Sequence, residues 1–203
     1  MIRFVPFLCG LLVIGITYVA SAQPRPDADP YVSRQSLSDG ITLATHHNGL
    51  TIIVQENHSA PVATVRCYVK NTGSVYEGKY LGAGLSHVLE HVVSGGTTSK
   101  RTEKASEELH DTLGGVSNAF TSLGLTAYFV DCPAARVNTA IDLVADWMQH
   151  CSFKPDEFTR ELAVVQREMA DRSNDRRTVE FHMLQKLLFR SHPARHPIIG
   201  YSQ

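Results

Sequence analysis

The sequence lacks the charge patterns that mark nucleic-acid-binding proteins. Its 19 Lys and Arg residues nearly balance its 20 Asp and Glu residues, so the net charge is −1 at pH 7, and like charges do not cluster in runs. Neither a nucleic-acid partner nor attraction to an anionic membrane surface is therefore indicated. The chain also lacks internal repeats and low-complexity segments. With 203 residues, 43% of them apolar, it is long enough for one globular domain with a sizeable core.

Long apolar runs are absent except at the N-terminus. Arg3 precedes an almost wholly apolar stretch from Phe4 to Ala20, and Ala20-Ser21-Ala22 has the form of a signal-peptidase site. We expect residues 1–22 to be a secretory signal peptide that is cleaved before Gln23. A membrane anchor is the alternative, although the apolar stretch is short and Pro6 interrupts it.

Cysteine is scarce, and no cysteine pair has the close spacing of a zinc site. Three cysteines follow the predicted signal peptide, namely Cys67, Cys132 and Cys151. In an oxidising compartment one pair could form a disulfide and leave one thiol free, or all three could be buried thiols. The sequence does not choose between these alternatives.

The rest of the chain predicts an α+β fold. Residues 23–38 are polar and carry three prolines, which indicates a flexible leader before a domain at 39–203. Short strands come first and helices later, which predicts a mixed, mainly antiparallel sheet with helices packed on one face. We expect strands at 41–45, 50–54, 62–69, 116–120 and 125–132, and helices at 82–93, 103–113, 133–150, 155–172 and around 181–188. The Asn48-Gly49 pair predicts a hairpin turn between the first two strands.

The predicted helix at 82–93 carries the most informative motif, His87-Val88-Leu89-Glu90-His91. Two histidines four residues apart project from one helical face and can bind a single Zn²⁺. Glu90 borders the same face and could take the proton from a metal-activated water. The alternative is an amphipathic helix with two surface histidines.

A catalytic zinc needs a third protein ligand besides two histidines. The candidates are Glu161 and Glu168, which are seven residues apart and therefore share one face of the predicted helix at 155–172. Val164 and Val165 lie between them and indicate that this side of the helix is partly buried. A carboxylate there needs a partner, and a metal ion is one. The alternative is a pair of solvated glutamates.

These residues resemble the pitrilysin–insulysin family of inverted-motif zinc peptidases, in its catalytic N-terminal domain. The chain has the inverted motif and, at Glu168, a glutamate 77 positions after His91, the separation typical of that family. Residues 114–121, followed by 126–128, resemble the family's active-site edge strand. Residues 196–200 are similar to a recurrent family segment.

The resemblance implies a role for each matching residue. His87, His91 and Glu168 would bind Zn²⁺, Glu90 would be the general base, and Glu161 would support the site without binding the metal directly. The edge-strand residues Asn118, Ala119 and Phe120 would contact an extended peptide by strand addition. The activity implied is zinc-dependent endopeptidase hydrolysis of peptides or unfolded polypeptides.

The resemblance also bears on partners and location. Working members of the family have a second half that supplies an Arg and Tyr pair near the substrate, and no such pair is assigned here. We therefore expect a C-terminal half-domain in cis, or a partner subunit in trans, and a domain incomplete at its C-terminal end. The alternatives are a non-catalytic assembly subunit and a truncated zinc-binding product. The signal peptide together with this fold predicts a periplasmic or secreted protein.

Overall fold

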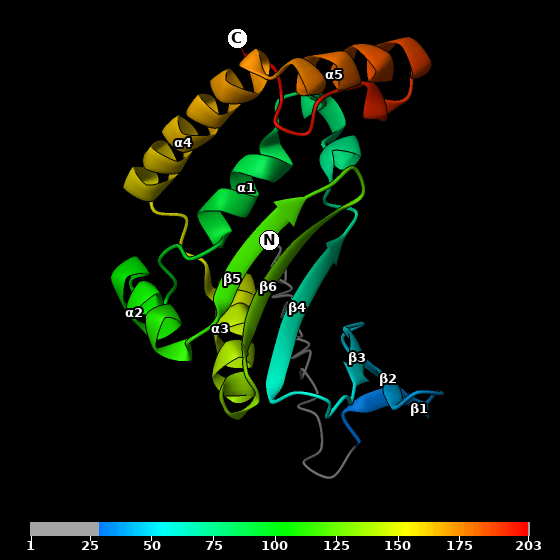
Figure 1. Cartoon of the computed structure of the whole chain (residues 1–203), viewed down its shortest axis with the longest axis vertical. Coiled ribbons are helices and arrows are strands. Elements are labelled where there is room, and N and C mark those ends of the chain that lie inside the picture. The colour runs from blue at the N-terminus through cyan, green and yellow to red at the C-terminus, as the bar shows by residue number, and fades with distance from the viewer. Residues whose placement is uncertain (1–28, 203) are drawn as a thin grey trace, which may run out of the picture. The chain divides into compact units, whose positions relative to one another are not determined.

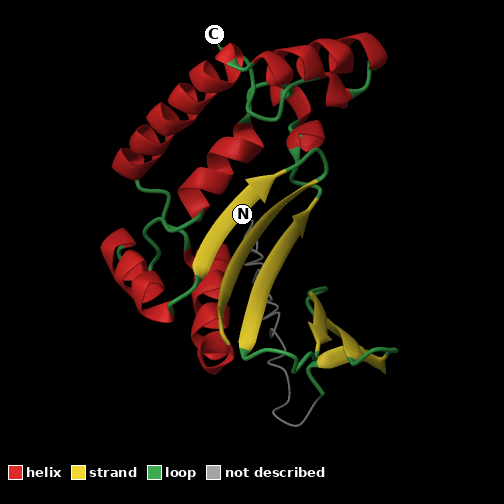
Figure 2. Cartoon of the chain, in the orientation of Figure 1, coloured by secondary structure: helices red, strands yellow, loops and turns green. Residues whose placement is uncertain are grey.

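The computed structural model describes residues 29–202, which belong to two compact units, one ending in the sequence at Asn57 and the other beginning at His58. The predicted signal peptide and the first residues of the predicted leader lie outside the described residues. Figure 1 shows the chain by element, and Figure 2 shows its helices and strands by type. Within residues 29–202, no helix is both long and apolar enough to span a membrane.

The first unit contains one antiparallel sheet in the order β1-β2-β3. Its strands are β1 Tyr31–Ser36, β2 Ile41–His46 and β3 Thr51–Gln55. The β2–β3 hairpin turns at Asn48 and Gly49 as predicted, and Asn48 Oδ1 accepts a hydrogen bond from the backbone N–H of Leu50 at 3.0 Å. The polar composition of 31–36 predicted a flexible leader, which is wrong for these residues. The leader prolines all precede Tyr31, so this segment keeps every N–H it needs to pair with β2.

The second unit is built on an antiparallel sheet in the order β4-β6-β5, with β6 at its centre. The strands are β4 Val62–Lys70, β5 Val116–Thr121 and β6 Leu125–Pro133. The α+β class is confirmed, but the described strands form two separate three-stranded sheets rather than one. Strand pairing depends on contacts between distant parts of the chain, which side-chain alternation does not encode.

Five helices accompany this sheet, all of them close to their predicted positions: α1 Leu85–Val93, α2 Glu103–Leu113, α3 Val137–His150, α4 Pro155–Asn174 and α5 Arg176–Leu188. Helix α1 begins three residues later than predicted. Gly82 and Gly84 have φ angles of 85° and 73°, which a right-handed helix does not contain.

The main hydrophobic core lies between α3 and the sheet (Figure 1). Leu143 and Trp147 of α3 pack with Val130 of β6 and with Leu113, the last residue of α2. A second cluster joins α1 to α4 through Val88, Val92, Val165 and Ile199. The second cluster positions the two helices that carry the predicted metal ligands. All three cysteines of the described residues are free thiols.

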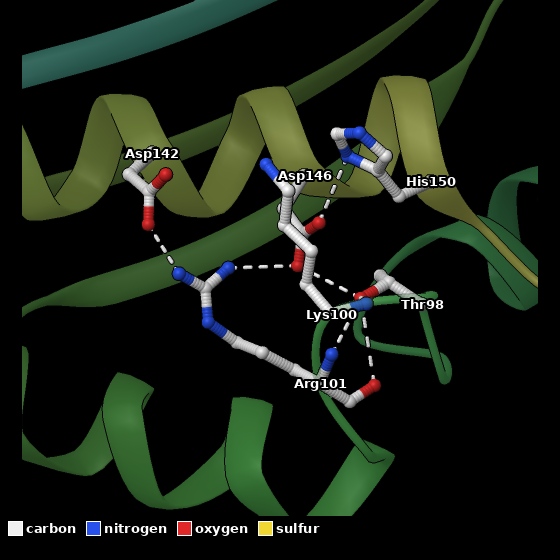
Figure 3. A network of polar contacts seen from close by, with 6 residues as sticks. All are labelled: Thr98, Lys100, Arg101, Asp142, Asp146 and His150. Carbon is white, nitrogen blue, oxygen red and sulfur yellow. Dashed lines mark hydrogen bonds and ion pairs between the residues drawn. The ribbon is translucent and has the colours of Figure 1, made fainter.

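A buried carboxylate connects α3 to the loop between α1 and α2 (Figure 3). Asp146 has a side chain with no exposed surface, and its Oδ2 accepts hydrogen bonds from Thr98 Oγ1 at 2.8 Å and from Arg101 Nη1 at 2.7 Å. Its Oδ1 lies 3.0 Å from His150 Nδ1. Arg101 also pairs with Asp142, whose side chain is 56% exposed.

We predict that Asp146→Ala lowers the free energy of unfolding by about 3 kcal/mol, because it removes the buried partner of Arg101 and Thr98. Urea denaturation of the full chain would measure the change. Asp142→Ala is the matched control, since it removes an exposed carboxylate from the same guanidinium and should cost less than about 1 kcal/mol. Equal losses in the two variants would contradict the prediction.

Candidate metal centre

Helix α1, which packs against α4 (Figure 1), carries both histidines of the motif. The rings of His87 and His91 lie with their centroids 4.9 Å apart and their planes at 81°. The start of the helix is held by Glu77, whose Oε1 accepts a hydrogen bond from the backbone N–H of Ser86 at 2.8 Å. A buried acidic side chain therefore satisfies a donor in the first turn of the helix that carries the histidines.

Helix α4 brings Glu168 to these two rings. Its Oε2 lies 3.6 Å from Nε2 of His87 and 3.6 Å from Nε2 of His91. One ligand atom from each of the three residues falls within 4.8 Å of the others. Among residues 29–202, this is the only group of three or more His, Cys, Asp or Glu residues with such spacing.

The spacing fits a zinc ion better than a hydrogen bond. A distance of 3.6 Å is too long for an N–H···O hydrogen bond. Tetrahedral zinc with ligands at about 2.0–2.2 Å holds those ligand atoms roughly 3.4 Å from one another. Two imidazole nitrogens and one carboxylate oxygen form the donor set of a catalytic zinc site that keeps a position for water. The residues present therefore fit the metal.

The protonation state of His87 also suits metal binding. Burial lowers its pKa to about 4, although the nearby Glu168 carboxylate acts in the opposite direction. His87 is therefore neutral at pH 7, with a lone pair available on one ring nitrogen. Its Nδ1 is buried and has no hydrogen-bond partner among the described residues.

Two charged side chains, Glu161 and Arg172, contact the predicted ligands His91 and Glu168. Glu161 Oε2 lies 3.4 Å from Nδ1 of His91, the ring nitrogen that does not face Glu168. The family resemblance implies a supporting role for Glu161, and metal-binding histidines commonly have a carboxylate at the second nitrogen. Arg172, one turn after Glu168, donates a hydrogen bond to Glu168 Oε1 and leaves Oε2 for the histidines.

Glu90 lies on α1 beside the histidines and is only 8% exposed. Its Oε2 accepts a hydrogen bond from Thr121 Oγ1 at 2.6 Å. Burial raises the pKa of Glu90, and the hydrogen bond from Thr121 partly offsets this effect. A raised pKa makes a carboxylate a stronger base, which suits a group that is to accept a proton.

A pocket of about 190 Å³ opens beside Glu90 and His91. Asn118 and Ala119 of β5 line it, as do residues of α4 and of the loop that follows α1. Asn118 Oδ1 accepts a hydrogen bond from the backbone N–H of Ala119 at 2.8 Å. Phe120, the third predicted substrate residue, does not line this pocket and is 42% exposed.

Sequence reasoning missed four side chains that hold the site together. Thr121 fixes Glu90, Arg172 fixes Glu168, Glu77 accepts a hydrogen bond from a backbone N–H in the first turn of α1, and Glu157 holds the loop after α1. Only Arg172 had a local signal, because it lies four residues after Glu168 on the same helix. The others act across larger distances in the sequence.

The comparisons with known proteins point to one family. Residues 51–202 match the family model described as insulinase, peptidase family M16. The chain belongs to this family. The resemblance to the pitrilysin–insulysin peptidases is therefore confirmed at the level of the family.

Two relatives illustrate the similarity. The probable mitochondrial-processing peptidase subunit beta of Arabidopsis thaliana is 34% identical over 161 residues, which cover 79% of this chain and 30% of that protein. An uncharacterized zinc protease of Bacillus subtilis is 30% identical over 156 residues, covering 77% of this chain and 37% of that protein. The chain thus spans about a third of the length of these M16 relatives.

Solved structures confirm the fold. A protease from Helicobacter pylori matches with a TM-score of 0.67 and 25% identity, covering 83% of this chain and 38% of that chain. A peptidase M16 inactive domain from Pseudomonas fluorescens matches with a TM-score of 0.69 over 79% of this chain and 38% of that chain, at 16% identity. The second match bears on the fold alone.

Proposed function

We propose that this chain is the metal-binding half of a zinc-dependent endopeptidase. The observation that carries the proposal is the convergence of His87 Nε2, His91 Nε2 and Glu168 Oε2 on one point at metal-ligand spacing. Family membership and the zinc-protease relatives support the same conclusion.

Zinc, when bound, supplies a Lewis acid that lowers the pKa of water toward ~7 and polarises the scissile carbonyl. The chain's own residues then handle the proton. Thr121 holds Oε2 of Glu90, so Oε1 is the oxygen available to take a proton from the attacking water. The same carboxyl group would then return that proton to the leaving amine.

The substrate would bind as an extended peptide along β5. This strand pairs with β6 on one side, and Asn118 and Ala119 lie where the strand borders the pocket beside Glu90. A strand added at a sheet edge is held mainly through its backbone, which suits unfolded polypeptides of varied sequence. Peptides or unfolded polypeptides are therefore the substrate class that we propose.

Activity would require a second half, in cis or from a partner subunit. This chain covers 30% and 37% of the two relatives described above, and one of them is named as a subunit of a peptidase. Helix α5 exposes large apolar side chains on one face, with Phe181, Leu184 and Leu188 at 58%, 50% and 66%. An exposed apolar face on a helix is one feature of surfaces that another polypeptide covers.

The direct test is zinc stoichiometry combined with cleavage of a quenched-fluorescence peptide library. Both would be measured on the full chain and on any longer natural form of the protein. One zinc per chain, with cleavage in at least one form, would support the proposal. Zinc binding without cleavage in any form would favour a non-catalytic assembly subunit, and no zinc binding would overturn the proposal.

We also propose that the protein is exported to the periplasm or secreted. The support is the composition of residues 1–22, which have the charged start, apolar stretch and small-residue site of a signal peptide. Mass spectrometry of the mature protein should find Gln23 at its N-terminus. An uncleaved chain in the cytoplasm would contradict the proposal.

A further inference from the structure

The loop between α1 and α2 is bound to α4 by a buried carboxylate that the proposed chemistry does not use. Glu157, in the first turn of α4, is 8% exposed. Its Oε2 accepts a hydrogen bond from the backbone N–H of Thr97 at 2.9 Å, and its Oε1 accepts one from Thr97 Oγ1 at 2.5 Å. Both oxygens of the carboxylate are thus engaged by a single residue, 60 positions earlier in the chain.

Thr97 extends this connection to α2. Its Oγ1 accepts a hydrogen bond from the backbone N–H of Glu103, the first residue of α2, at 3.1 Å. Its carbonyl oxygen accepts one from the N–H of Ser152 at 2.9 Å. One threonine side chain therefore ties the starts of α2 and α4 together, six residues after the metal-binding His91.

The backbone before Thr97 lies too close to α1 for any side chain at position 96. A Cβ atom built on Gly96 would stand 2.3 Å from the carbonyl oxygen of Val92, in the last turn of α1, and 3.4 Å from Glu157 Oε2. The loop is therefore pressed between the end of α1 and the start of α4. The same loop supplies Ser94 and Gly96 to the pocket beside Glu90.

Glu157 lies on the same helix as the predicted ligand Glu168, so its contact with Thr97 affects where that ligand lies. At a rise of 1.5 Å per residue, Glu157 lies about 6 Å along the helix axis from Glu161 and about 16 Å from Glu168. Between these points, Val165 packs against Val88 and Val92 of α1. Loss of the Glu157 contact would let α4 tilt about this apolar contact, and the spacing between the α1 histidines and Glu168 would change.

We propose that Glu157 is a positioning residue, which through Thr97 fixes α4 against the end of α1 and so sets the spacing of His87, His91 and Glu168. The inference rests on the proposed zinc function. A displacement of about 1 Å in a catalytic group can cost about 100-fold in rate, so a contact outside the metal site can matter for the site. Burying a carboxylate is unfavourable without strong hydrogen bonds, and the two from Thr97 offset that penalty.

The test compares Thr97→Val and Glu157→Ala with Glu157→Gln. Valine keeps the shape of threonine without its hydroxyl group, and alanine removes both acceptor oxygens of Glu157. Glutamine loses the negative charge but keeps an acceptor for the Thr97 N–H and gains a donor for Thr97 Oγ1. We expect Thr97→Val and Glu157→Ala to weaken Zn²⁺ affinity roughly tenfold, the lower end of the effect of removing groups that support metal ligands. Glu157→Gln should stay within about threefold of the wild type.

Two readouts besides activity separate positioning from stability. Zn²⁺ affinity would be measured by competition with a chromophoric chelator, and ligand geometry from the visible absorption spectrum of the Co²⁺-substituted protein. Leu143→Ala is the control, because this buried residue of α3 belongs to the other hydrophobic cluster. It should lower the melting temperature while leaving Zn²⁺ affinity and the Co²⁺ spectrum unchanged.

The outcomes distinguish this inference from the proposed function. If the wild type binds zinc and both Thr97→Val and Glu157→Ala bind it equally well, the positioning role is overturned and the zinc site stands. If Glu157→Gln loses as much affinity as Glu157→Ala, the effect is one of charge, and the positioning role is again overturned. If the wild type binds no zinc, the proposed function fails and this inference fails with it.

Discussion

Replacing Glu90 with glutamine is expected to abolish peptide hydrolysis and to leave zinc bound. Glutamine occupies nearly the same space and can still accept the hydrogen bond from Thr121, but its amide cannot take a proton from water. General-base catalysis contributes about 10²–10⁴-fold to a rate, so kcat should fall by at least about 100-fold. The measurement is peptide cleavage alongside metal content, in whichever form of the protein is active.

The control for this variant is Glu108→Gln, which makes the same chemical change at a side chain that is 67% exposed on α2. It should not alter kcat or zinc content. Turnover of Glu90→Gln at the wild-type rate would remove Glu90 from the mechanism. Loss of zinc in Glu90→Gln would instead show that the carboxylate is needed to form the metal site.

Replacing His87 with alanine is expected to remove the metal. The variant keeps only His91 and Glu168 of the three converging groups, and two ligands do not hold a catalytic zinc. We expect Zn²⁺ affinity to fall by more than about 100-fold, the upper end of the effect of removing a group that supports a ligand. Chelator competition and metal analysis after dialysis would measure it.

Thermal stability gives a second measure of the loss of Zn²⁺ binding in His87→Ala. At a free zinc concentration 100 times the dissociation constant, binding to the folded state adds about 2.7 kcal/mol to the free energy of unfolding. Zinc should therefore raise the melting temperature of the wild type but not that of His87→Ala. His182→Ala on α5 is the control and should respond to zinc as the wild type does. A zinc-induced shift in His87→Ala equal to that of the wild type would contradict the site.

The elements that carry the site could be predicted because their signals are local. The four-residue spacing of His87 and His91 and the seven-residue spacing of Glu161 and Glu168 each define one face of one helix. The end of α2 follows from Gly114, which adopts a left-handed backbone conformation, whereas α1 begins three residues after the predicted start at Gly82. Such features need no knowledge of the rest of the chain.

The meeting of α1 with α4 could not be derived from spacing alone. The distance of 77 residues between His91 and Glu168 carries no geometric information, and only the family resemblance chose Glu168 over Glu161 as the third ligand. Thr121 and Glu157 were missed for the same reason, because their partners lie 31 and 60 residues away. A threonine in a strand or a glutamate in the first turn of a helix has an ordinary local explanation.

Strand β1 and the division into two sheets also depend on contacts between distant residues, which local sequence does not predict. The composition of residues 31–36 is typical of a flexible segment, and only the partner β2 makes it a strand. Alternation predicted each of the other strands correctly but gave no information on which strands pair. Apart from the β2–β3 hairpin, which the Asn48-Gly49 turn predicted, pairing was therefore the part of the fold that the sequence did not determine.

The hydrogen bond between the Asn118 side chain and the N–H of Ala119 has a consequence for the resting protein. Exposed strand borders tend to recruit copies of themselves, which leads to insoluble assemblies. Here the side-chain oxygen of Asn118 satisfies a main-chain donor of β5, so one fewer donor is open to a strand of another molecule. Under the proposed function, a carbonyl oxygen of an incoming peptide would take the place of the Asn118 oxygen at that donor.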